Sequence, residues 1–170
     1  MTHLLFVHTD VIAPEDGWTP VEPLRALGPT RSFVSGDPAS ERIRIAYFRR
    51  GADGALVAKV WFGPDAEGAP GHAHGGAIAS VLDDAMGVAA WAAGRCVVTS
   101  TLQVRFRAMV PLQVVVMVEA AVRATHVGRL HLTAKLRDSG GVPLAEASGG
   151  FVRIAPERIG LSRALLVDRT

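Results

Sequence analysis

Cysteine is almost absent from this chain. Cys96 is the only one among 170 residues, so no disulfide can form within the chain. It lies in the apolar run Cys96-Val97-Val98, where a small buried thiol is the expected role. A secreted scaffold built on disulfides is therefore excluded, and the composition suits a reducing compartment.

Long apolar runs, lysines and aromatic residues are also scarce. No stretch offers about 20 uninterrupted apolar residues, so we expect no membrane span. The N-terminus lacks the basic start and the apolar run of a signal peptide. Lys59 and Lys135 are the only lysines, the formal net charge is +2, and aromatic residues make up 6% of the chain, which argues against a nucleic-acid-binding surface. We expect a soluble cytoplasmic protein with neither nucleic-acid nor membrane partners.

Hydrophobic residues, by contrast, are abundant and follow an ordered pattern. They make up 49% of the chain, which is enough for the core of one domain. Prolines punctuate residues 1–40 and predict an irregular N-terminal extension. Residues 41–154 are expected to form the folded domain, and residues 155–170 a C-terminal tail.

Within the domain, alternating polar and apolar residues predict two strands, one long helix and then four strands. The short turns between the last four strands favour antiparallel pairing. A helix that is apolar on nearly every face must be covered by the sheet. We therefore predict an α+β fold in which a curved antiparallel sheet wraps around one long central helix. The expected strands are 42–48, 55–62, 96–107, 112–125, 130–138 and 143–153, and the expected helix is 75–93.

The most informative segment is GAPGHAHGGAIASVLDDAMGVAAWAAG at residues 68–94. A turn rich in glycine, proline and histidine leads directly into the apolar helix. Backbone N–H groups at a helix start lack partners and lie at the positive end of the helix dipole. Gly75 and Gly76 would let a substrate carbonyl approach these groups closely. With an acid on the same helix, the segment predicts a site for acyl chemistry.

Two adjacent acids on this helix differ in their surroundings. Asp83 shares its helical stripe with small residues, which would form a shallow groove for a ligand or a facing helix. Asp84 shares its stripe with bulkier residues. Asp83 is therefore the expected working carboxylate, with an interface ion pair as its alternative. Asp84 is expected to be structural, an arginine being a candidate partner. The small residues beside Asp83 are Gly76, Ala79, Ser80, Gly87 and Ala90.

The order of elements and three segments resemble the hotdog-fold thioesterases, in the branch of phenylacetyl-CoA thioesterase-like and THEM4-like proteins. The segments are GAPGHAHGGAIASVLDDAMG, TSTLQVRF from Thr99, and VGRLHLTAKLRDSGGVPLAEASGGFV near the end. The resemblance covers about residues 41–154 and implies a hotdog fold. It also implies an acid nine residues after the histidine of His-Gly-Gly, which is Asp83. A Ser or Thr on the next strand is matched by Thr99, and the oxyanion N–H by Gly75.

The resemblance further implies an assembly of several copies. Hotdog thioesterases are dimers, often doubled to tetramers, with active sites at the subunit interface. We therefore expect a homodimer or a homotetramer built as a dimer of dimers, in which Asp83 of one copy faces His74-Gly75 of another. One departure concerns the loop before His-Gly-Gly. Some relatives carry an asparagine there to orient water, whereas this chain reads Glu67-Gly68-Ala69.

The predicted site combines a carboxylate, an oxyanion donor and a substrate channel. Asp83 would attack the thioester carbon or activate a water that does, and the sequence leaves both routes open. Arg129 would contact a coenzyme A phosphate, and Met86, Trp91, Val81 and Phe106 are candidate walls of an apolar acyl pocket. The expected catalytic residues are Asp83, Gly75, His74 and Thr99. The expected substrate contacts are Gly76, Arg129, Ser100 and Met86.

We expect no metal and no cofactor, coenzyme A being part of the substrate. His72 and His74 form a His-x-His pair, but no further histidine or cysteine follows at ligand spacing. The predicted function is hydrolysis of a small or medium acyl-CoA thioester. Two alternatives stay open: a hydratase or dehydratase acting on acyl thioesters with the same fold, and a non-catalytic acyl-CoA-binding module.

Overall fold

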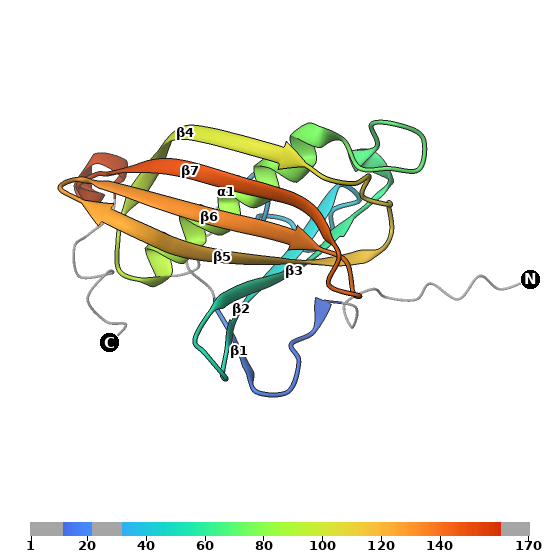
Figure 1. The fold of residues 1–170 in the computed structure, drawn as a ribbon, viewed down its shortest axis with the longest axis horizontal. Coiled ribbons are helices and arrows are strands. Elements are labelled where there is room, and N and C mark those ends of the chain that lie inside the picture. The colour runs from blue at the N-terminus through green and yellow to red at the C-terminus, as the bar shows by residue number, and fades with distance from the viewer. Residues whose placement is uncertain (1–11, 22–31, 161–170) are drawn as a thin grey trace, which may run out of the picture.

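The computed structural model describes residues 12–21 and 32–160, which form one curved sheet with a long helix against it (Figure 1). The helix, α1, spans Gly75–Ala92, and two short 3-10 helices, η3 and η4, span Pro64–Ala66 and Pro156–Ile159. The strands are β1 (Trp18–Pro20), β2 (Ile43–Arg50), β3 (Leu56–Phe62), β4 (Val97–Phe106), β5 (Val115–His126), β6 (Arg129–Arg137) and β7 (Pro143–Arg153).

The sheet has the strand order β1-β2-β3-β5-β6-β7-β4, and every neighbouring pair is antiparallel. All six predicted strands and the predicted helix are present, with ends shifted by no more than three residues. The chain leaves β3 for α1 and returns at β4, which lies on the far edge of the sheet. The predicted antiparallel sheet around a central helix is confirmed.

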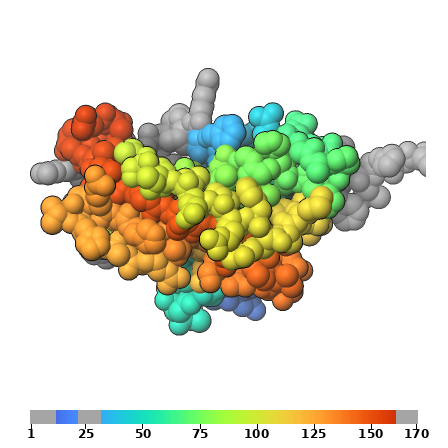
Figure 2. All heavy atoms as spheres, turned by 45° about the horizontal axis from the view of Figure 1, so that its top comes forward, coloured from blue at the N-terminus to red at the C-terminus, as the bar shows by residue number. Residues whose placement is uncertain are grey.

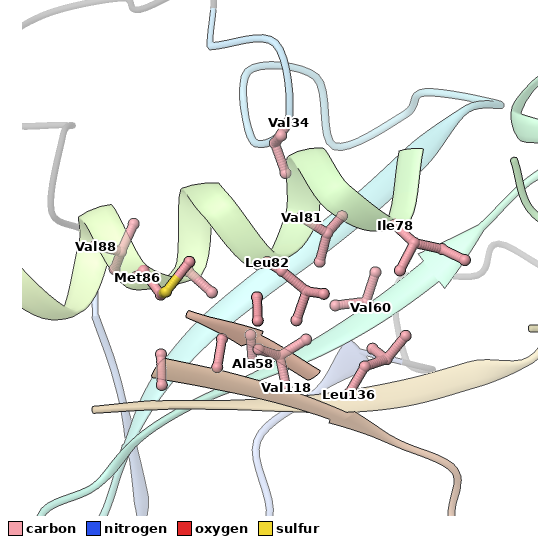
Figure 3. Packing of buried hydrophobic residues seen from close by; sticks show 14 of the residues in the cluster. Val34, Ala58, Val60, Ile78, Val81, Leu82, Met86, Val88, Val118 and Leu136 are labelled. Carbon is pink, nitrogen blue, oxygen red and sulfur yellow. The ribbon is translucent and has the colours of Figure 1, made fainter. Parts of the chain in front are cut away.

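α1 is apolar on nearly every face, and the structure covers it from two sides. Figure 3 shows Ile78 and Leu82 pointing from α1 towards Val60 and Val118 of the sheet, while Val34 lies on the opposite side of the helix. Full burial of each such side chain contributes about 1.5–3 kcal/mol. After the last turn, Gly94 adopts a left-handed φ of 71° and donates its N–H to the Trp91 carbonyl at 2.9 Å. This arrangement ends the helix and starts the turn into β4.

The N-terminal segment contributes a strand that the sequence analysis did not predict. β1 pairs with β2, and the Trp18 ring centroid lies 5.7 Å from that of Phe48. Phe48 and its cross-strand partner Val57 are 3% and 1% exposed. Because alternate residues of a strand face opposite ways, these two lie on the face of the sheet away from α1, where Trp18 helps to cover them. Part of the expected 1–40 extension therefore pairs with the sheet.

Strand β4 forms the opposite edge, and it is exposed. Among the described strands it pairs with β7 alone, so one row of its backbone N–H and C=O groups has no strand partner there. Val98, Leu102 and Phe106 expose 45%, 40% and 52% of their surface. In Figure 2, β4 (yellow) lies at the surface beside the segment that leads into α1 (green). A long, partly apolar edge of this kind is suited to pairing with another strand.

Gly149 of β7 offers a test of the packing under α1. A Cβ there would lie 2.7 Å from Cε2 of Phe151 and 3.2 Å from Cε of Met86. Gly149→Ala is therefore expected to lower the free energy of unfolding by about 1–3 kcal/mol, as overpacked cores do. Thermal denaturation measures this loss. Gly87→Ala is the control, because its Cβ would meet no described atom within 4 Å and alanine favours a helix by about 1 kcal/mol. Equal losses in Tm from both variants would contradict the packing.

Candidate active site

The start of α1 carries one occupied and one unoccupied N–H group. His74 is the N-cap residue, and its Nδ1 accepts a hydrogen bond from the Gly76 N–H at 2.9 Å. The Gly75 N–H donates to no acceptor among residues 12–21 and 32–160. The N–H predicted to bind an oxyanion therefore has no competing partner there. The Gly76 N–H, also predicted to contact substrate, is instead engaged by His74.

The loop before α1 holds His74 in place. The His74 N–H donates to the Ala66 carbonyl at 2.7 Å, and the Glu67 carboxylate accepts from the Gly71 N–H, also at 2.7 Å. A Cβ at position 68 would lie 2.8 Å from the His74 Cα. Gly68, which stands in the loop where some relatives carry asparagine, is thus required by close packing. Because Nδ1 of His74 accepts a hydrogen bond, the neutral ring carries its proton on Nε2.

The aromatic ring of Phe106 lies beside the free donor. A Cβ at position 75 would be 3.3 Å from Cζ of Phe106, so the ring packs against Gly75 itself. Phe106 ends β4 and remains 52% exposed. An apolar ring next to an unpaired N–H lowers the local dielectric and strengthens a hydrogen bond to a substrate oxygen.

Further along α1, the Asp83 carboxylate is held by a hydroxyl. Thr99 of β4 donates from Oγ1 to Oδ1 of Asp83 at 2.8 Å. In the part of the chain that the structure describes, no basic side chain forms an ion pair with Asp83. A carboxylate fixed by a neutral donor keeps its charge and its other lone pairs for proton transfer or attack. The interface ion pair considered for Asp83 is therefore not formed within one chain.

The neighbouring Asp84 faces a different strand. Tyr47 of β2 donates its hydroxyl to Oδ2 of Asp84 at 2.5 Å. Burial raises the pKa of Asp84, the bond from Tyr47 partly opposes this, and the charge of Asp83 raises the pKa further. Burial, followed by the Asp84 charge, raises the pKa of Tyr47 well above 10.0. The partner of Asp84 is thus a tyrosine and not the candidate arginine, because β2 brings a hydroxyl and no base to this point of the helix.

Asp83 and Thr99 lie in a groove of about 160 Å³ between α1 and the first residues of β4. Trp91 lines this groove and donates Nε1–H to the Val97 carbonyl at 3.3 Å, which orients its ring. The groove thus combines two hydroxyl-held carboxylates, Asp83 and Asp84, with mainly apolar walls, a composition typical of small-molecule sites. Its apolar lining comprises Val88, Trp91, Val97, Val98 and Phe151.

The two parts of the candidate site are separated within one chain. Asp83 follows Gly75 by eight residues, which is about 12 Å along the helix axis at ~1.5 Å per residue. Reacting atoms must come within about 3–3.5 Å of one another. A carbonyl bound by Gly75 therefore cannot be attacked by Asp83 of the same copy.

The remaining predicted residues lie in different places. Ser100 sits at the irregularity between Thr99 and Thr101 and donates its hydroxyl to the Gly150 carbonyl at 2.8 Å, so its side chain is tied to β7. Arg129 is exposed at the start of β6, next to the turn from β5. Met86, like Val81, is fully buried. Within one copy, both support the groove from the core and offer no surface to a ligand.

A larger hollow of about 280 Å³ lies on the outer face of the sheet, away from α1. Its charged lining is mainly basic, with Arg105, Arg123 and Lys135 around one acid, Glu146. Arg107 adds a salt bridge to Glu146 at 2.9 Å. The one acid of this hollow is thus paired, and neither Asp83 nor Gly75 lines it, so this hollow is not the candidate site.

Metal-ligand clusters and bilayer-spanning helices are both absent from the described residues. No group of three or more His, Cys, Asp or Glu side chains there could hold a metal ion. No helix there combines the length and the hydropathy that a bilayer span requires. The expectation that the protein needs no metal stays a prediction.

Comparison with known proteins identifies the family. Residues 70–144 match the family model described as thioesterase superfamily. Acyl-coenzyme A thioesterase THEM4 of Bos taurus is 34% identical over 133 residues, which are 78% of this chain and 55% of that protein. The chain belongs to the thioesterase superfamily. It spans about half the length of this relative, and 39% of THEM5 of Mus musculus.

Solved structures of this superfamily share the fold. One thioesterase superfamily protein superimposes with a TM-score of 0.66 at 24% identity, over 85% of this chain and 71% of the other. A hypothetical thioesterase from Streptococcus pneumoniae, solved with coenzyme A, has a TM-score of 0.60 at 18% identity, over 69% of this chain and 89% of the other. Both likenesses show the hotdog fold.

Tyr47 is the residue of this thioesterase-superfamily site that sequence analysis missed. It is the only tyrosine of the chain, and it lies on a strand whose alternate residues face the core. A buried tyrosine hydroxyl usually finds a hydrogen-bond partner, and the buried helix offers two acids. That signal was present, but it does not say which acid Tyr47 meets.

Asp84→Asn tests the charge state of this pair. The pKa of Asp84 in the folded protein is raised above 3.8. The protonated form of Asp84 therefore favours folding, and this contribution to stability is lost as the pH rises through the folded pKa. At pH 7 the ionised carboxylate opposes folding. Asparagine keeps an acceptor oxygen for Tyr47 without the charge. We expect a Tm at pH 7 equal to or above that of the parent, with the advantage shrinking towards about pH 4. Thermal denaturation at a series of pH values measures this difference in Tm. A Tm of Asp84→Asn that falls further below that of the parent as the pH rises would contradict the raised pKa.

Proposed function

We propose that the chain is an acyl-CoA thioesterase, an enzyme that hydrolyses the thioester of a small or medium acyl-CoA. The observation that carries this proposal is the Asp83 carboxylate, which the Thr99 hydroxyl holds at 2.8 Å. It lies in a groove with mainly apolar walls and has no basic partner in the described chain. Named relatives support it, since THEM4 and THEM5 are described as acyl-coenzyme A thioesterases.

The proposed site needs two copies of the chain. Asp83 and Thr99 lie near the start of β4, whereas Gly75 and Phe106 meet at its end. If two β4 strands pair antiparallel about their middle, Thr99 of one copy lies opposite Phe106 of the other. The Asp83 carboxylate then faces the Gly75 N–H of the second copy. The same two-fold rotation crosses the helices near Ala79, halfway between Gly75 and Asp83, where small side chains permit close approach.

The chemistry follows from this arrangement. Either Asp83 removes a proton from water, whose oxygen attacks the thioester carbon, or a carboxylate oxygen attacks directly and water cleaves the resulting anhydride. In both routes the carbonyl oxygen becomes an oxyanion that the Gly75 N–H stabilises, and the C–S bond then breaks. The thiolate of coenzyme A takes up a proton, so acyl-CoA and water give a carboxylic acid and the free thiol.

Thr99 and His74 support the two reacting groups. Thr99 fixes one carboxylate oxygen of Asp83 and leaves the other for chemistry. His74 orients the turn through Gly76 and carries a proton on Nε2 that can be donated near the reacting carbonyl. Arg129 remains the predicted phosphate contact for coenzyme A. The homodimer or homotetramer, the absence of a cofactor and the cytoplasmic location are likewise predictions.

Asp83→Asn is expected to lower kcat for acyl-CoA hydrolysis by about 10²- to 10⁴-fold, because the amide can neither accept the proton nor attack. Release of free thiol from a panel of acyl-CoAs measures the rate. Asp65→Asn, an exposed acid on η3 remote from the groove, is the matched control and should retain parental kcat. Parental turnover by Asp83→Asn would remove this residue from the mechanism. Hydration of enoyl-CoA without thiol release, or binding without turnover, would favour the two alternative functions.

Gly75→Pro tests the oxyanion donor and the shared site together. Proline is well tolerated at the first position of a helix, and His74 has an extended backbone (φ −62°, ψ 138°) that suits a following proline. The substitution removes the N–H while keeping the helix start, so kcat should fall by about 10²- to 10³-fold. Thiol release by the purified variant measures the loss.

A mixed dimer of Asp83→Asn and Gly75→Pro copies, purified through two different affinity tags, separates shared from unshared sites. If each site joins Asp83 of one copy to Gly75 of the other, one site of the two is intact and about half of parental activity returns. Activity no higher than in either single variant would mean that each site lies within one copy.

A further inference from the structure

The two adjacent acids of α1 connect the helix to opposite parts of the sheet. Asp83 accepts a hydrogen bond from Thr99 on β4, and Asp84 accepts one from Tyr47 on β2. In the sheet order, β4 is one edge and β2 is the second strand from the other edge. The sheet therefore curves far enough for both ends to reach the same turn of the helix.

The Tyr47–Asp84 contact is buried and specific. Tyr47 is 6% exposed, and its hydroxyl lies 2.5 Å from Oδ2 of Asp84. Among the described ion pairs, none involves Asp84. Asp84 itself is half-buried and lines the groove beside Asp83. A half-buried carboxylate without a cation is held in place by its hydrogen bond, so losing the tyrosine hydroxyl frees Asp84 to move from this position.

The geometry of a helix links the two contacts. Successive residues are about 100° apart around the axis, and side-chain ends lie about 5–6 Å from it. A roll of about 10° therefore moves a carboxylate by roughly 1 Å, and a shift of that size can reduce catalysis by about 10²-fold. Nothing on α1 between residues 75 and 92 forms a salt bridge that would oppose such a roll. Core packing and the Trp91 bond to Val97 restrict it along the helix. At the reacting carboxylate itself, two hydrogen bonds in different directions from neighbouring residues, Asp83 and Asp84, fix the roll.

We propose that Tyr47 is a positioning residue, which anchors Asp84 to β2 and thereby sets the roll of α1 that holds Asp83 against Thr99. This inference rests on the proposed thioesterase function for its kinetic consequences. The structural part of the proposal is that the distance between Asp83 and Thr99 depends on Tyr47. This part does not require the chain to have any activity.

Tyr47→Phe is the direct test. We expect kcat for acyl-CoA hydrolysis to fall by about tenfold or more while KM changes less than about threefold, because the reacting carboxylate is displaced and the binding surfaces are not. Asp84→Asn keeps an acceptor for Tyr47 and should lose far less kcat than Tyr47→Phe. Equal kcat in Tyr47→Phe and the parent would overturn the proposal.

A second variant covers the case in which an unpaired Asp84 prevents folding. Tyr47→Phe combined with Asp84→Ala removes both polar partners, which restores stability without restoring the anchor. Its kcat should stay as low as that of Tyr47→Phe, and a return to the parental kcat would overturn the proposal. Val57→Ala is the control for general loss of stability, because Val57 is buried on the face of the sheet away from α1. If Val57→Ala loses as much kcat as Tyr47→Phe at the same loss of Tm, Tyr47 has only a structural role and the proposal is overturned.

A crystal structure of Tyr47→Phe separates this inference from the proposed function. The Asp83 Oδ1 to Thr99 Oγ1 distance should lengthen beyond hydrogen-bond range, above about 3.5 Å. A distance that stays at 2.8 Å, as in the parent, would overturn the positioning role even if the enzyme is active. A longer distance in Tyr47→Phe, together with a parent chain that hydrolyses no acyl-CoA, would support the positioning role and refute the proposed function.

Discussion

The hydrogen bond from Thr99 to Asp83 joins the central helix to the exposed edge of the sheet, and the account of this site depends on it. It places an acid that has no basic partner within the described chain in a groove that is otherwise lined mainly by apolar residues, with Asp84 beside it. Burying part of a carboxylate opposes folding unless donors compensate. Here a single neutral hydroxyl compensates, which fixes the group without cancelling its charge. A salt bridge would have stabilised the fold more directly but would have left a weaker base.

The separation between Asp83 and the helix start makes the edge strand part of the proposed site. A rigid helix keeps the two groups about 12 Å apart, so the proposed mechanism needs a second copy to bring its own Gly75 to the carboxylate. The exposed β4 edge offers both unpaired backbone groups and apolar side chains for such pairing. Phe106, which lies against Gly75, then shields the donor and contributes to the proposed contact between copies. Assembly and catalysis would thus depend on the same strand.

Most of the fold could be predicted because it depends on local patterns. Alternating residues gave the strands, and the apolar run gave α1 with its start at Gly75. Helical geometry singled out Asp83, and the family resemblance paired it with Thr99. The errors concern contacts between distant segments. The bond between Tyr47 and Asp84 joins residues 37 positions apart, and no local pattern says that β2 presents a hydroxyl there. One local contact was not predicted either: His74 engages the Gly76 N–H through a side-chain orientation that the sequence does not specify.

The most direct test of the central claim is a crystal structure with a thioether analogue of an acyl-CoA, in which a CH₂ group separates the sulfur from the carbonyl and prevents hydrolysis. The account predicts the analogue between two copies, its carbonyl oxygen about 2.7–3.1 Å from the Gly75 nitrogen of one copy. The carbonyl carbon should lie within about 3.5 Å of an Asp83 carboxylate oxygen of the other copy, or be joined to it through one water. An analogue bound with its carbonyl remote from Asp83, or with both groups supplied by the same copy, would contradict the account.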